Sequence, residues 1–363
     1  MSGPVLIMAG GTGGHVFPAL ALARLLRAGS REVIWLGTRR GLEARVVPAE
    51  NIPVEWLSVG GLRGKGIATL LAAPWQLLRA LWQALSVMRR HRPTVVVGMG
   101  GFVTGPGGLA AWLCRRPLLI HEQNAIAGYS NRCLAPLARE VLTAFPSAFS
   151  GLPKARLIGN PVRRDIAALP APAQRLAGRS GAIRLLVVGG SLGAMRLNNT
   201  MPRALAMLAA DAAAPRFEVR HQTGDKHLDA TRAAYAQAGV EADVSAFITD
   251  MADALSWADL VVCRAGALTI AELAAAGVAS VLVPYPHAVD DHQTHNARFL
   301  VDAGAGRLLA DAALTPQLLA QELRSLGADR TALLRMAESA RRVARPGAAQ
   351  QLLEACLAAE KRA

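Results

Sequence analysis

The chain has 363 residues, of which 52% are hydrophobic, and a formal net charge of +14. The length suits two domains of ordinary size, and the hydrophobic content excludes a disordered chain. The positive charge predicts an anionic partner. Nucleic acid is disfavoured, because the sequence has no dense block of Lys and Arg and few aromatic residues for base stacking. Anionic lipid and a phosphorylated substrate remain as candidate partners.

Apolar, Val- and Leu-rich runs alternate with helix-like runs along the chain. The expected strands of the first half are 5–9, 32–36, 54–57, 94–98, 118–121 and 141–144. Those of the second half are 183–188, 217–221, 244–247, 260–263, 280–283 and 306–309. Such runs suit strands buried on both faces of a parallel sheet. We therefore predict an α/β protein with two doubly wound domains, and ligands at the carboxyl ends of the strands.

The boundary between the domains is expected near Gly159-Asn160-Pro161, which a Pro- and Ala-rich stretch follows. This gives an amino-terminal domain over residues 1–161 and a carboxyl-terminal domain over 162–341. The last helix, within about 342–363, is free to dock on either domain, including back on the first.

Two glycine-rich turns each follow an expected strand and open an expected helix. They are Gly10-Gly11-Thr12-Gly13-Gly14-His15 and Gly189-Gly190-Ser191-Leu192-Gly193-Ala194. This arrangement points free backbone N–H groups and the positive end of a helix dipole at an anion. Two such turns in matching positions predict a twinned protein that handles a phosphate-bearing molecule between its halves.

His15 stands at the start of the first of these helices. A helix N-terminus disfavours an added positive charge, so the imidazole is expected to stay neutral and to accept a proton. The functional interpretation is a general base. The alternative is a neutral histidine that caps the helix or contacts phosphate.

The apolar segment 67–88 is long enough to span a bilayer, but Pro74 and Arg79 interrupt it. Four of its apolar side chains fall on one helical face, namely Leu71, Trp75, Leu78 and Trp82. With basic residues on both sides, the pattern is typical of a helix that lies on an anionic membrane. An ordinary helix facing the core is an equal alternative.

Polar residues follow three further strands. His121-Glu122-Gln123-Asn124 ends one strand, where packing does not explain four polar side chains; Glu122 is a second candidate base and Asn124 a reader of hydroxyl or amide groups. In the run 264–272, Glu272 suits the hydroxyls of a ribose, although a helix-start Glu that complements the dipole is as plausible. The run 290–296 resembles a metal site without a strict spacing, so we interpret it as sugar contacts, with Gln293 foremost.

Together these motifs resemble those of one family, the MurG-type UDP-N-acetylglucosamine:N-acetylmuramyl-(pentapeptide) pyrophosphoryl-undecaprenol N-acetylglucosaminyltransferases, which convert lipid I to lipid II. The matching stretches run through nearly the whole chain in the family's order: 10–15, 98–108, 121–124, 159–163, 189–194, 221–224, 264–272 and 290–296.

The resemblance implies a glycosyltransferase of the B type (GT-B), with Rossmann-like domains whose parallel sheets face a central cleft. The carboxyl-terminal domain would hold UDP-GlcNAc, and the amino-terminal domain would take the lipid-linked acceptor. The helix around Trp75 would meet the bilayer, with Trp112 added to the patch. The protein would be peripheral on the cytoplasmic face of the inner membrane, with division and cell-wall proteins as further partners.

The resemblance also implies a set of contacts to UDP-GlcNAc. These are Thr12, Gly13, Gly14, Asn124, Arg163, Ser191, Ile248, Ala267, Leu268, Thr269, Ile270, Ala271, Glu272 and Gln293, with Gly190 and Arg264 as additional contacts. Ile248 would bind uracil through its backbone, Glu272 the ribose, and Ser191 with the first amides of the helix 267–276 the diphosphate. No Asp-x-Asp occurs in the chain, so no metal and no cofactor is expected.

The expected reaction is an inverting, single-displacement transfer. The C4 hydroxyl of the acceptor's N-acetylmuramoyl unit attacks the anomeric carbon of UDP-α-GlcNAc, which gives a β-1,4 link and UDP. His15 is the expected base, with Glu122 as alternative or partner. Two rival functions remain: a UDP-GlcNAc 2-epimerase of the same architecture, and a membrane-associated scaffold that binds nucleotide sugar without turnover.

Overall fold

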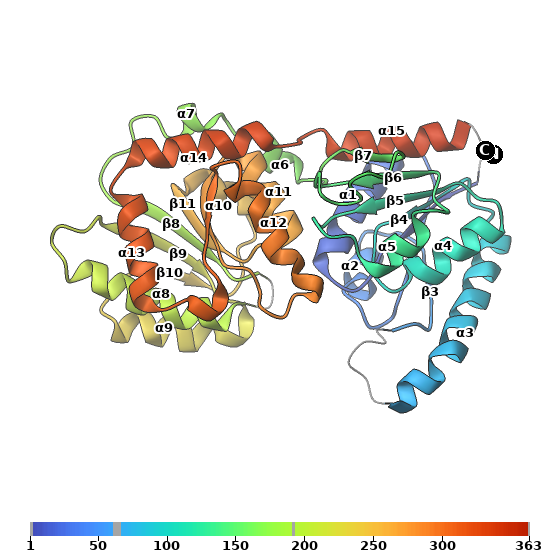
Figure 1. Ribbon diagram of the computed structural model, residues 1–363, viewed down its shortest axis with the longest axis horizontal. Coiled ribbons are helices and arrows are strands. Elements are labelled where there is room, and N and C mark those ends of the chain that lie inside the picture. The colour runs from blue at the N-terminus through green and yellow to red at the C-terminus, as the bar shows by residue number, and fades with distance from the viewer. Residues whose placement is uncertain (1–2, 61–66, 191–192, 362–363) are drawn as a thin grey trace. The chain divides into compact units, whose positions relative to one another are not determined.

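The structure is a computed structural model that describes residues 3–60, 67–190 and 193–361, with side chains described from residue 73 onward in the helix that begins at Ile67. Two predicted contacts, Ser191 and the side chain of Leu71, lie outside this described part. The chain divides into two compact units (Figure 1). Unit 1 comprises Met1–Val162 with Pro346–Ala363, and unit 2 comprises Arg163–Arg345.

Unit 1 is built on a seven-stranded parallel sheet with the strand order β3-β2-β1-β4-β5-β6-β7. The strands are β1 Val5–Met8, β2 Val33–Gly37, β3 Val54–Trp56, β4 Val95–Gly98, β5 Leu118–Glu122, β6 Glu140–Thr143 and β7 Ala155–Leu157. Its helices are α1 Gly13–Ala28, α2 Glu43–Ala49, α3 Ile67–His91, α4 Thr104–Leu113, α5 Tyr129–Leu134 and α15 Ala348–Lys361. The four middle strands β1, β2, β4 and β5 are buried throughout, as their continuous apolar sequences require.

Unit 2 repeats the plan on a six-stranded parallel sheet with the order β10-β9-β8-β11-β12-β13. The strands are β8 Ile183–Val188, β9 Phe217–Gln222, β10 Asp243–Ser245, β11 Leu260–Cys263, β12 Ala279–Leu282 and β13 Gly306–Leu308. The α-helices are α6 Arg164–Ala167, α7 Pro172–Arg175, α8 Met195–Ala209, α9 Leu228–Gln237, α10 Met251–Trp257, α11 Ala267–Ala276, α12 His292–Val301, α13 Pro316–Gly327 and α14 Arg330–Val343. Short 3₁₀ turns lie at Asp225–His227, Val289–Asp291 and Asp311–Ala313.

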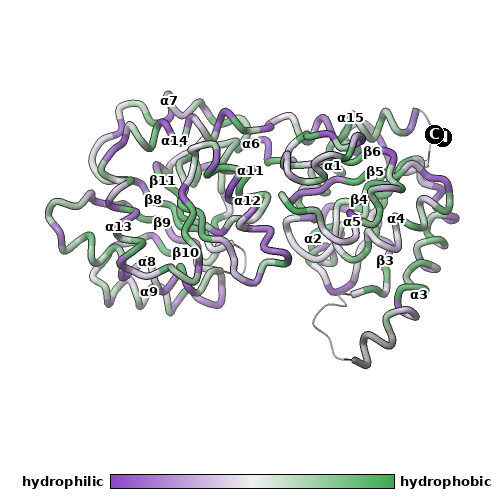
Figure 2. The backbone as a smooth tube through the Cα atoms, viewed as in Figure 1, coloured by the Kyte–Doolittle hydropathy of each residue, from purple (hydrophilic) through white to green (hydrophobic). Residues whose placement is uncertain are grey.

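The strand order of each sheet reverses direction beside its first strand, between β1 and β4 in unit 1 and between β8 and β11 in unit 2. In a doubly wound sheet this switch point leaves a crevice at the carboxyl ends of the strands. Both glycine-rich turns follow these first strands. The hydrophobic strands that surround each switch point are visible in Figure 2.

The last helix, α15, belongs to unit 1 and packs beside α1 (Figure 1). Leu352, Cys356 and Ala359 are buried in the same core as Ile7 of β1. Glu360 accepts a hydrogen bond from Thr94 Oγ1 at 2.6 Å and pairs with Arg31. An apolar face and a half-buried carboxylate thus fix the position of α15 on the first unit.

The predicted strands coincide with the observed ones to within about two residues at each end, and one strand was missed. That strand, β7, has only three residues and lies at the sheet edge. Its Ala-Arg-Leu sequence is half-exposed, so it lacks the apolar run that reveals a central strand.

Candidate functional site

The first glycine-rich turn connects β1 to α1 in unit 1. Thr12 is the N-cap residue of α1, with extended backbone angles, and its side chain makes no capping hydrogen bond. No acidic residue stands in the first turn of the helix. First-turn N–H groups have no hydrogen-bond partner within the helix, so the amides of Gly13 and Gly14 are available to bind an anion.

A second loop, after β4, supports this turn. Gly100 and Gly101 have φ angles of +98° and +87°, which side-chain-bearing residues rarely adopt. A Cβ atom on Gly100 would lie 2.5 Å from His15 Nδ1, and one on Gly101 would overlap the carbonyl oxygen of Gly10. The loop therefore needs glycine to pack against both the histidine ring and the turn.

A chain of hydrogen bonds leads from His15 into the core of unit 1. His15 Nδ1 lies 2.9 Å from Gln123 Oε1, and Gln123 Nε2 lies 3.0 Å from His121 Nδ1. His121 Nε2 lies 2.9 Å from the carbonyl oxygen of Gly159. His121 and Gln123 are buried, and His15 is half-buried at the outer end of the chain.

The carbonyl of Gly159, at the buried end of this hydrogen-bond chain, determines which atoms donate and which accept along it. A carbonyl only accepts, so His121 Nε2 carries a proton; burial lowers the pKa of His121 to about 4, so the ring is neutral and Nδ1 accepts from Gln123. Gln123 Nε2 also donates to the backbone carbonyl of His121, at 3.1 Å, which fixes the orientation of its amide. Gln123 Oε1 consequently accepts from His15 Nδ1–H. The lone pair of the neutral His15 ring is then on Nε2, where it is available to take a proton.

Glu122, the alternative candidate base, is buried, and each of its carboxylate oxygens accepts two hydrogen bonds. Its Oε1 accepts from the backbone N–H of Asn124 at 3.0 Å and from that residue's side-chain amide at 3.4 Å. Its Oε2 accepts from the N–H of Gly128 at 2.9 Å and from Asn131 Nδ2 at 2.8 Å. The carboxylate organises the loop that follows β5 and positions Asn124.

The partner of His15 is therefore Gln123, and the expectation of Glu122 as partner is wrong. The physical reason is the alternation of side chains along an extended segment. His121 and Gln123 point to the side where His15 lies, and Glu122 points to the other. We retain His15 as the proposed base and assign Glu122 to the loop.

Sequence analysis missed a second buried carboxylate, Glu43 of α2, which is completely inaccessible to solvent. Its Oε2 accepts from the N–H of Gly11 at 2.9 Å, and its Oε1 accepts from the N–H and hydroxyl of Thr38 at 2.9 and 2.8 Å. Glu43 thus ties the first glycine-rich turn to the loop after β2. The available signal was a carboxylate two residues after Gly41, at the start of the helix that follows a buried strand.

In unit 2 the second glycine-rich turn is held by a glutamine. Gly190 has a φ of +85°, and its carbonyl accepts from Gln222 Nε2 at 3.2 Å. Gln222 Oε1 accepts from the backbone N–H of Ile248 at 3.0 Å. Two predicted ligand contacts, Gly190 and Ile248, are therefore hydrogen-bonded to the same side chain, that of Gln222. Because the N–H of Ile248 is engaged, its carbonyl is the group that we expect to meet uracil.

The predicted contacts at the start of α11 lie at the carboxyl end of β11. Gly266 is the N-cap residue, without a side-chain cap, and no acidic residue occupies the first turn. Leu268, Thr269 and Ala271 are half-buried, whereas the side chain of Ile270 is completely buried. Ile270 is therefore a core residue, and its side chain does not reach a ligand.

Two predicted contacts, Arg163 and Glu272, pair with each other. Arg163 Nε donates to Glu272 Oε1 at 3.1 Å, and both residues belong to unit 2. Burial raises the pKa of Glu272 above its ordinary value, and the Arg163 charge opposes that rise. A carboxylate held in this way in the second turn of α11 suits hydrogen bonds from ribose hydroxyls.

Arg264, predicted as an additional ligand contact, is hydrogen-bonded within unit 2. Its Nη1 donates to the carbonyls of Val283 and Pro284, each at 3.1 Å, and pairs with Asp311 at 2.5 Å. Gln293, at the start of α12, accepts from the N–H of Tyr285 at 2.9 Å through Oε1, so it holds the loop after β12.

Buried neutral histidines occur in both units, and each predicts a loss of stability in acid. His221 of unit 2 lies between Tyr235 and Asn198, at 2.9 and 3.1 Å, and burial lowers its pKa to about 3. Below an unfolded-state pKa of about 6.5, the unfolded chain takes up protons that neither buried ring accepts. The contribution of each histidine to the free energy of unfolding is therefore fully present above that pH. It declines as the pH falls towards about 4 for His121 and about 3 for His221.

Between pH 6.5 and 5 we expect a loss of about 2 kcal/mol for each of these histidines. Urea unfolding at several pH values measures it. His221→Gln should flatten the pH dependence of unit 2, whereas replacement of the exposed His287 by Gln should not. Equal slopes in the wild type and in His221→Gln would contradict the burial argument.

The exposed surface of unit 1 carries an aromatic and aliphatic stripe on α3. Trp75, Leu78 and Trp82 are 77%, 57% and 69% exposed, and Trp112 of the adjoining α4 is 49% exposed. Figure 2 shows α3 as a largely hydrophobic helix. This stripe faces outward, whereas Ala84, Val87 and Met88 of the same helix are buried in the core of unit 1. Within the described residues, no helix is long and apolar enough to cross a bilayer.

Family models match both halves of the chain. The glycosyltransferase family 28 N-terminal domain matches residues 5–143, and the family's C-terminal domain matches residues 184–352. The chain belongs to glycosyltransferase family 28. The predicted activity class and the α/β fold with two parallel, doubly wound sheets are confirmed.

Full-length relatives narrow the family further. A protein of Alkalilimnicola ehrlichii is 59% identical over 359 residues, 98% of this chain and 99% of the relative. A protein of Marinobacter nauticus is 55% identical over 354 residues, 98% of this chain and 97% of the relative. Both are named UDP-N-acetylglucosamine--N-acetylmuramyl-(pentapeptide) pyrophosphoryl-undecaprenol N-acetylglucosamine transferase. Among solved structures, MurG of Acinetobacter baumannii superposes with a TM-score of 0.87 at 41% identity, covering 98% of this chain and 99% of that one. The resemblance stated from the motifs is confirmed.

Proposed function

We propose that this glycosyltransferase transfers GlcNAc from UDP-GlcNAc to undecaprenyl-pyrophosphoryl-MurNAc-pentapeptide (lipid I), which gives lipid II for peptidoglycan synthesis. Two relatives that span the whole chain carry the name of this activity. The structural observation that carries the chemistry is the hydrogen-bond chain that leaves Nε2 of His15 as a proton acceptor beside the N-terminus of α1.

Unit 2 is the proposed donor site. The carbonyl of Ile248 binds uracil, Glu272 binds the ribose hydroxyls, and the amides at the start of α11 bind the diphosphate. The negative charge that develops on departing UDP is stabilised by these fixed dipoles and by Arg163. Thr269, which is half-buried, lies in the first turn of the same helix. Ser191 and Gly190 of the second glycine-rich turn complete the proposed set.

Unit 1 is the proposed acceptor side, and it supplies the base. His15 Nε2 removes the proton of the C4 hydroxyl as that oxygen attacks the anomeric carbon, so the transfer inverts the anomeric configuration. The proton leaves on the imidazole, and Gln123 Oε1 continues to accept from Nδ1–H. Thr12, Gly13, Gly14 and Asn124 are proposed to border the transferred sugar.

The test uses the purified protein, lipid I and UDP-GlcNAc labelled in the sugar. We expect the label to pass into a lipid-extractable product with release of UDP. Release of free sugar epimer would identify the epimerase alternative, and binding without UDP release would identify the scaffold. Neither alternative is favoured, since the full-length relatives are transferases by name. We propose that the diphosphate needs no metal, so a chelator should leave the rate unchanged.

Donor affinity should depend on Glu272. Glu272→Gln removes charge-assisted hydrogen bonds to the ribose, and we expect UDP affinity to fall about 10- to 100-fold. Because burial raises the pKa of Glu272, UDP binding by the wild type should weaken in acid at a higher pH than an ordinary carboxyl would cause. Calorimetric titration measures both effects.

The matched control is Glu338→Gln, a change to an exposed carboxylate on α14. It should bind UDP as the wild type does. Unchanged UDP affinity in Glu272→Gln would remove the ribose assignment without affecting the assignment of the base.

We also propose that the α3 stripe attaches the enzyme to the cytoplasmic face of the cell membrane as a peripheral protein. Exposed Trp and Leu side chains gain free energy at the boundary of headgroups and acyl chains, and the basic residues around α3 favour anionic lipid. Cell-wall and division proteins are proposed as further partners at that surface, which would link the enzyme to cell shape and the cell cycle.

Vesicle binding tests the stripe. The double change Trp75→Ser, Trp82→Ser should reduce partition into phosphatidylglycerol-containing vesicles at least about tenfold. Met207→Ser, at an exposed apolar position of unit 2, is the control and should bind as the wild type does. Equal binding by all three proteins would rule out α3 as the attachment surface.

A further inference from the structure

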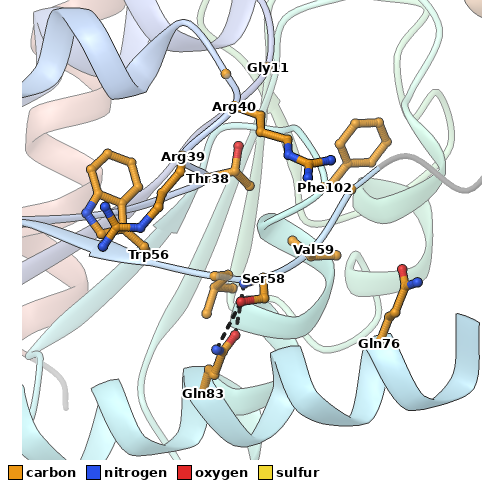
Figure 3. A pocket seen from close by; sticks show the side chains of 13 residues that line it. Gly11, Thr38, Arg39, Arg40, Trp56, Ser58, Val59, Gln76, Gln83 and Phe102 are labelled. Atoms are coloured by element: carbon orange, nitrogen blue, oxygen red, sulfur yellow. Dashed lines mark hydrogen bonds between the residues drawn. The ribbon is translucent and has the colours of Figure 1, made fainter.

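Unit 1 contains a cavity of about 850 Å³ that no assigned role explains (Figure 3). Its volume is within the usual range for ligand sites. Three segments and one helix face form it: the first glycine-rich turn at Gly11, the loop after β2 at 38–41, the segment 56–60 after β3, and Gln76 and Gln83 of α3. Phe102 closes one side.

The charge of the cavity is one-sided. Arg39 and Arg40 line it, and none of the described lining residues is acidic. Neither guanidinium has an ion-pair partner within the described part of the chain. The guanidinium of Arg39 lies over the ring of Trp56, 5.4 Å from its centroid, which holds it in place. Two unpaired guanidinium groups in one concave site favour an anionic ligand.

The remaining lining suits a peptide. Gln83 Oε1 accepts from the N–H of Ser58 at 2.9 Å, and Gln83 Nε2 donates to the hydroxyl of Ser58 at 3.2 Å (Figure 3). This pair fixes the wall between α3 and the segment after β3. Thr38 and Gln76 add a hydroxyl and an amide, and Trp56 and Phe102 add aromatic faces. The amide and hydroxyl groups can form hydrogen bonds with the backbone of a peptide, and the two guanidinium groups can pair with its carboxylate.

The location fits the proposed acceptor. One edge of the cavity is Gly11, in the turn that leads to His15. The opposite wall is α3, whose exposed stripe is the proposed membrane surface. A lipid-linked acceptor that reaches His15 from that surface therefore passes this cavity. The relatives' name places a pentapeptide on an N-acetylmuramyl group. A peptide that is joined to such an acyl group through its amino end has a free carboxyl end.

We infer that the cavity binds the peptide of the lipid-linked acceptor and that Arg39 and Arg40 pair with its carboxylates. The inference rests on the proposed function and adds a substrate subsite to it. Glu43 supports the site from behind, since it holds Thr38 and Gly11 at the rim.

The experiment compares three acceptors that share the lipid, the diphosphate and the sugar. One carries the peptide, one carries the peptide with its carboxylates amidated, and one carries no peptide. For the wild type we expect kcat/KM to fall about tenfold from the first acceptor to each of the others, mainly through KM. Arg40→Ala and Arg39→Gln should show that loss with the first acceptor, and should treat all three acceptors alike.

The control is Arg45→Ala, at an exposed arginine of α2 that does not line the cavity; it should retain the wild-type preference. An equal loss with the peptide-free acceptor would overturn the inference and indicate a phosphate site. Lost vesicle binding with an unchanged acceptor preference would overturn it in favour of a lipid headgroup. No transfer by the wild type to any acceptor would instead refute the proposed function.

Discussion

Replacement of His15 by Ala is expected to lower kcat by about two to four orders of magnitude, the usual contribution of a general base. The hydrogen-bond chain to Gly159 leaves His15 Nε2 as the acceptor, so removal of the ring leaves the acceptor hydroxyl without a base. Steady-state kinetics with saturating lipid I and UDP-GlcNAc measure the effect. UDP affinity should be unchanged, because the groups proposed to bind the UDP part of the donor lie in unit 2.

A different result would assign another role to His15. If the loss were confined to the KM of the acceptor, the ring would position the acceptor's diphosphate at the start of α1 and would not remove the proton. Gly100→Ala provides an independent check, since its Cβ would lie 2.5 Å from His15 Nδ1 and displace the ring. It should lower kcat without a change in UDP affinity.

Gln123 is a positioning residue, and its replacement by Met should lower kcat about 10- to 100-fold. Met preserves the volume but accepts no hydrogen bond from His15, so the tautomer with the lone pair on Nε2 loses its advantage. The buried Nδ1 of His121 also loses its donor, at a cost of about 1–3 kcal/mol of stability. Kinetics and urea unfolding separate the two effects.

Gln123→Glu is the rescue variant. A carboxylate still accepts from His15 Nδ1–H, so this variant should be more active than Gln123→Met. The added negative charge stabilises the protonated ring, and the acid limb of the kcat profile should move to higher pH. If both variants lost activity alike and the pH profile stayed in place, the glutamine would have only a structural role.

Much of the fold follows from patterns that the sequence displays openly. Strands such as Leu260–Cys263 are buried on both faces, so they read as short apolar runs between turns. The two glycine-rich turns mark the starts of α1 and α8, because glycine at fixed offsets after a strand is also a local pattern. The weakly amphipathic edge strand β7 carries no such signal.

The sequence predicted that the candidate residues follow buried strands, but it did not predict how they contact one another. His15 and the run 121–124 were identified because packing does not account for polar residues after buried strands, where ligands bind in this fold. Which of Glu122 and Gln123 faces His15 depends on side-chain alternation past the end of β5 and on the packing of neighbouring loops. The pairing of Arg264 was not predicted, because its partners, the carbonyls after β12 and Asp311, are distant in sequence.

The sequence by itself determined the twinned parallel-sheet architecture, the family and the set of candidate residues, since these depend on local periodicity and on glycine at fixed offsets. Only the tertiary structure decided that the last helix packs on the first unit, that Glu43 braces the first turn, and that Gln123 orients His15. Those outcomes depend on hydrogen bonds and packing between residues far apart in the chain, and a linear pattern of residues does not contain them.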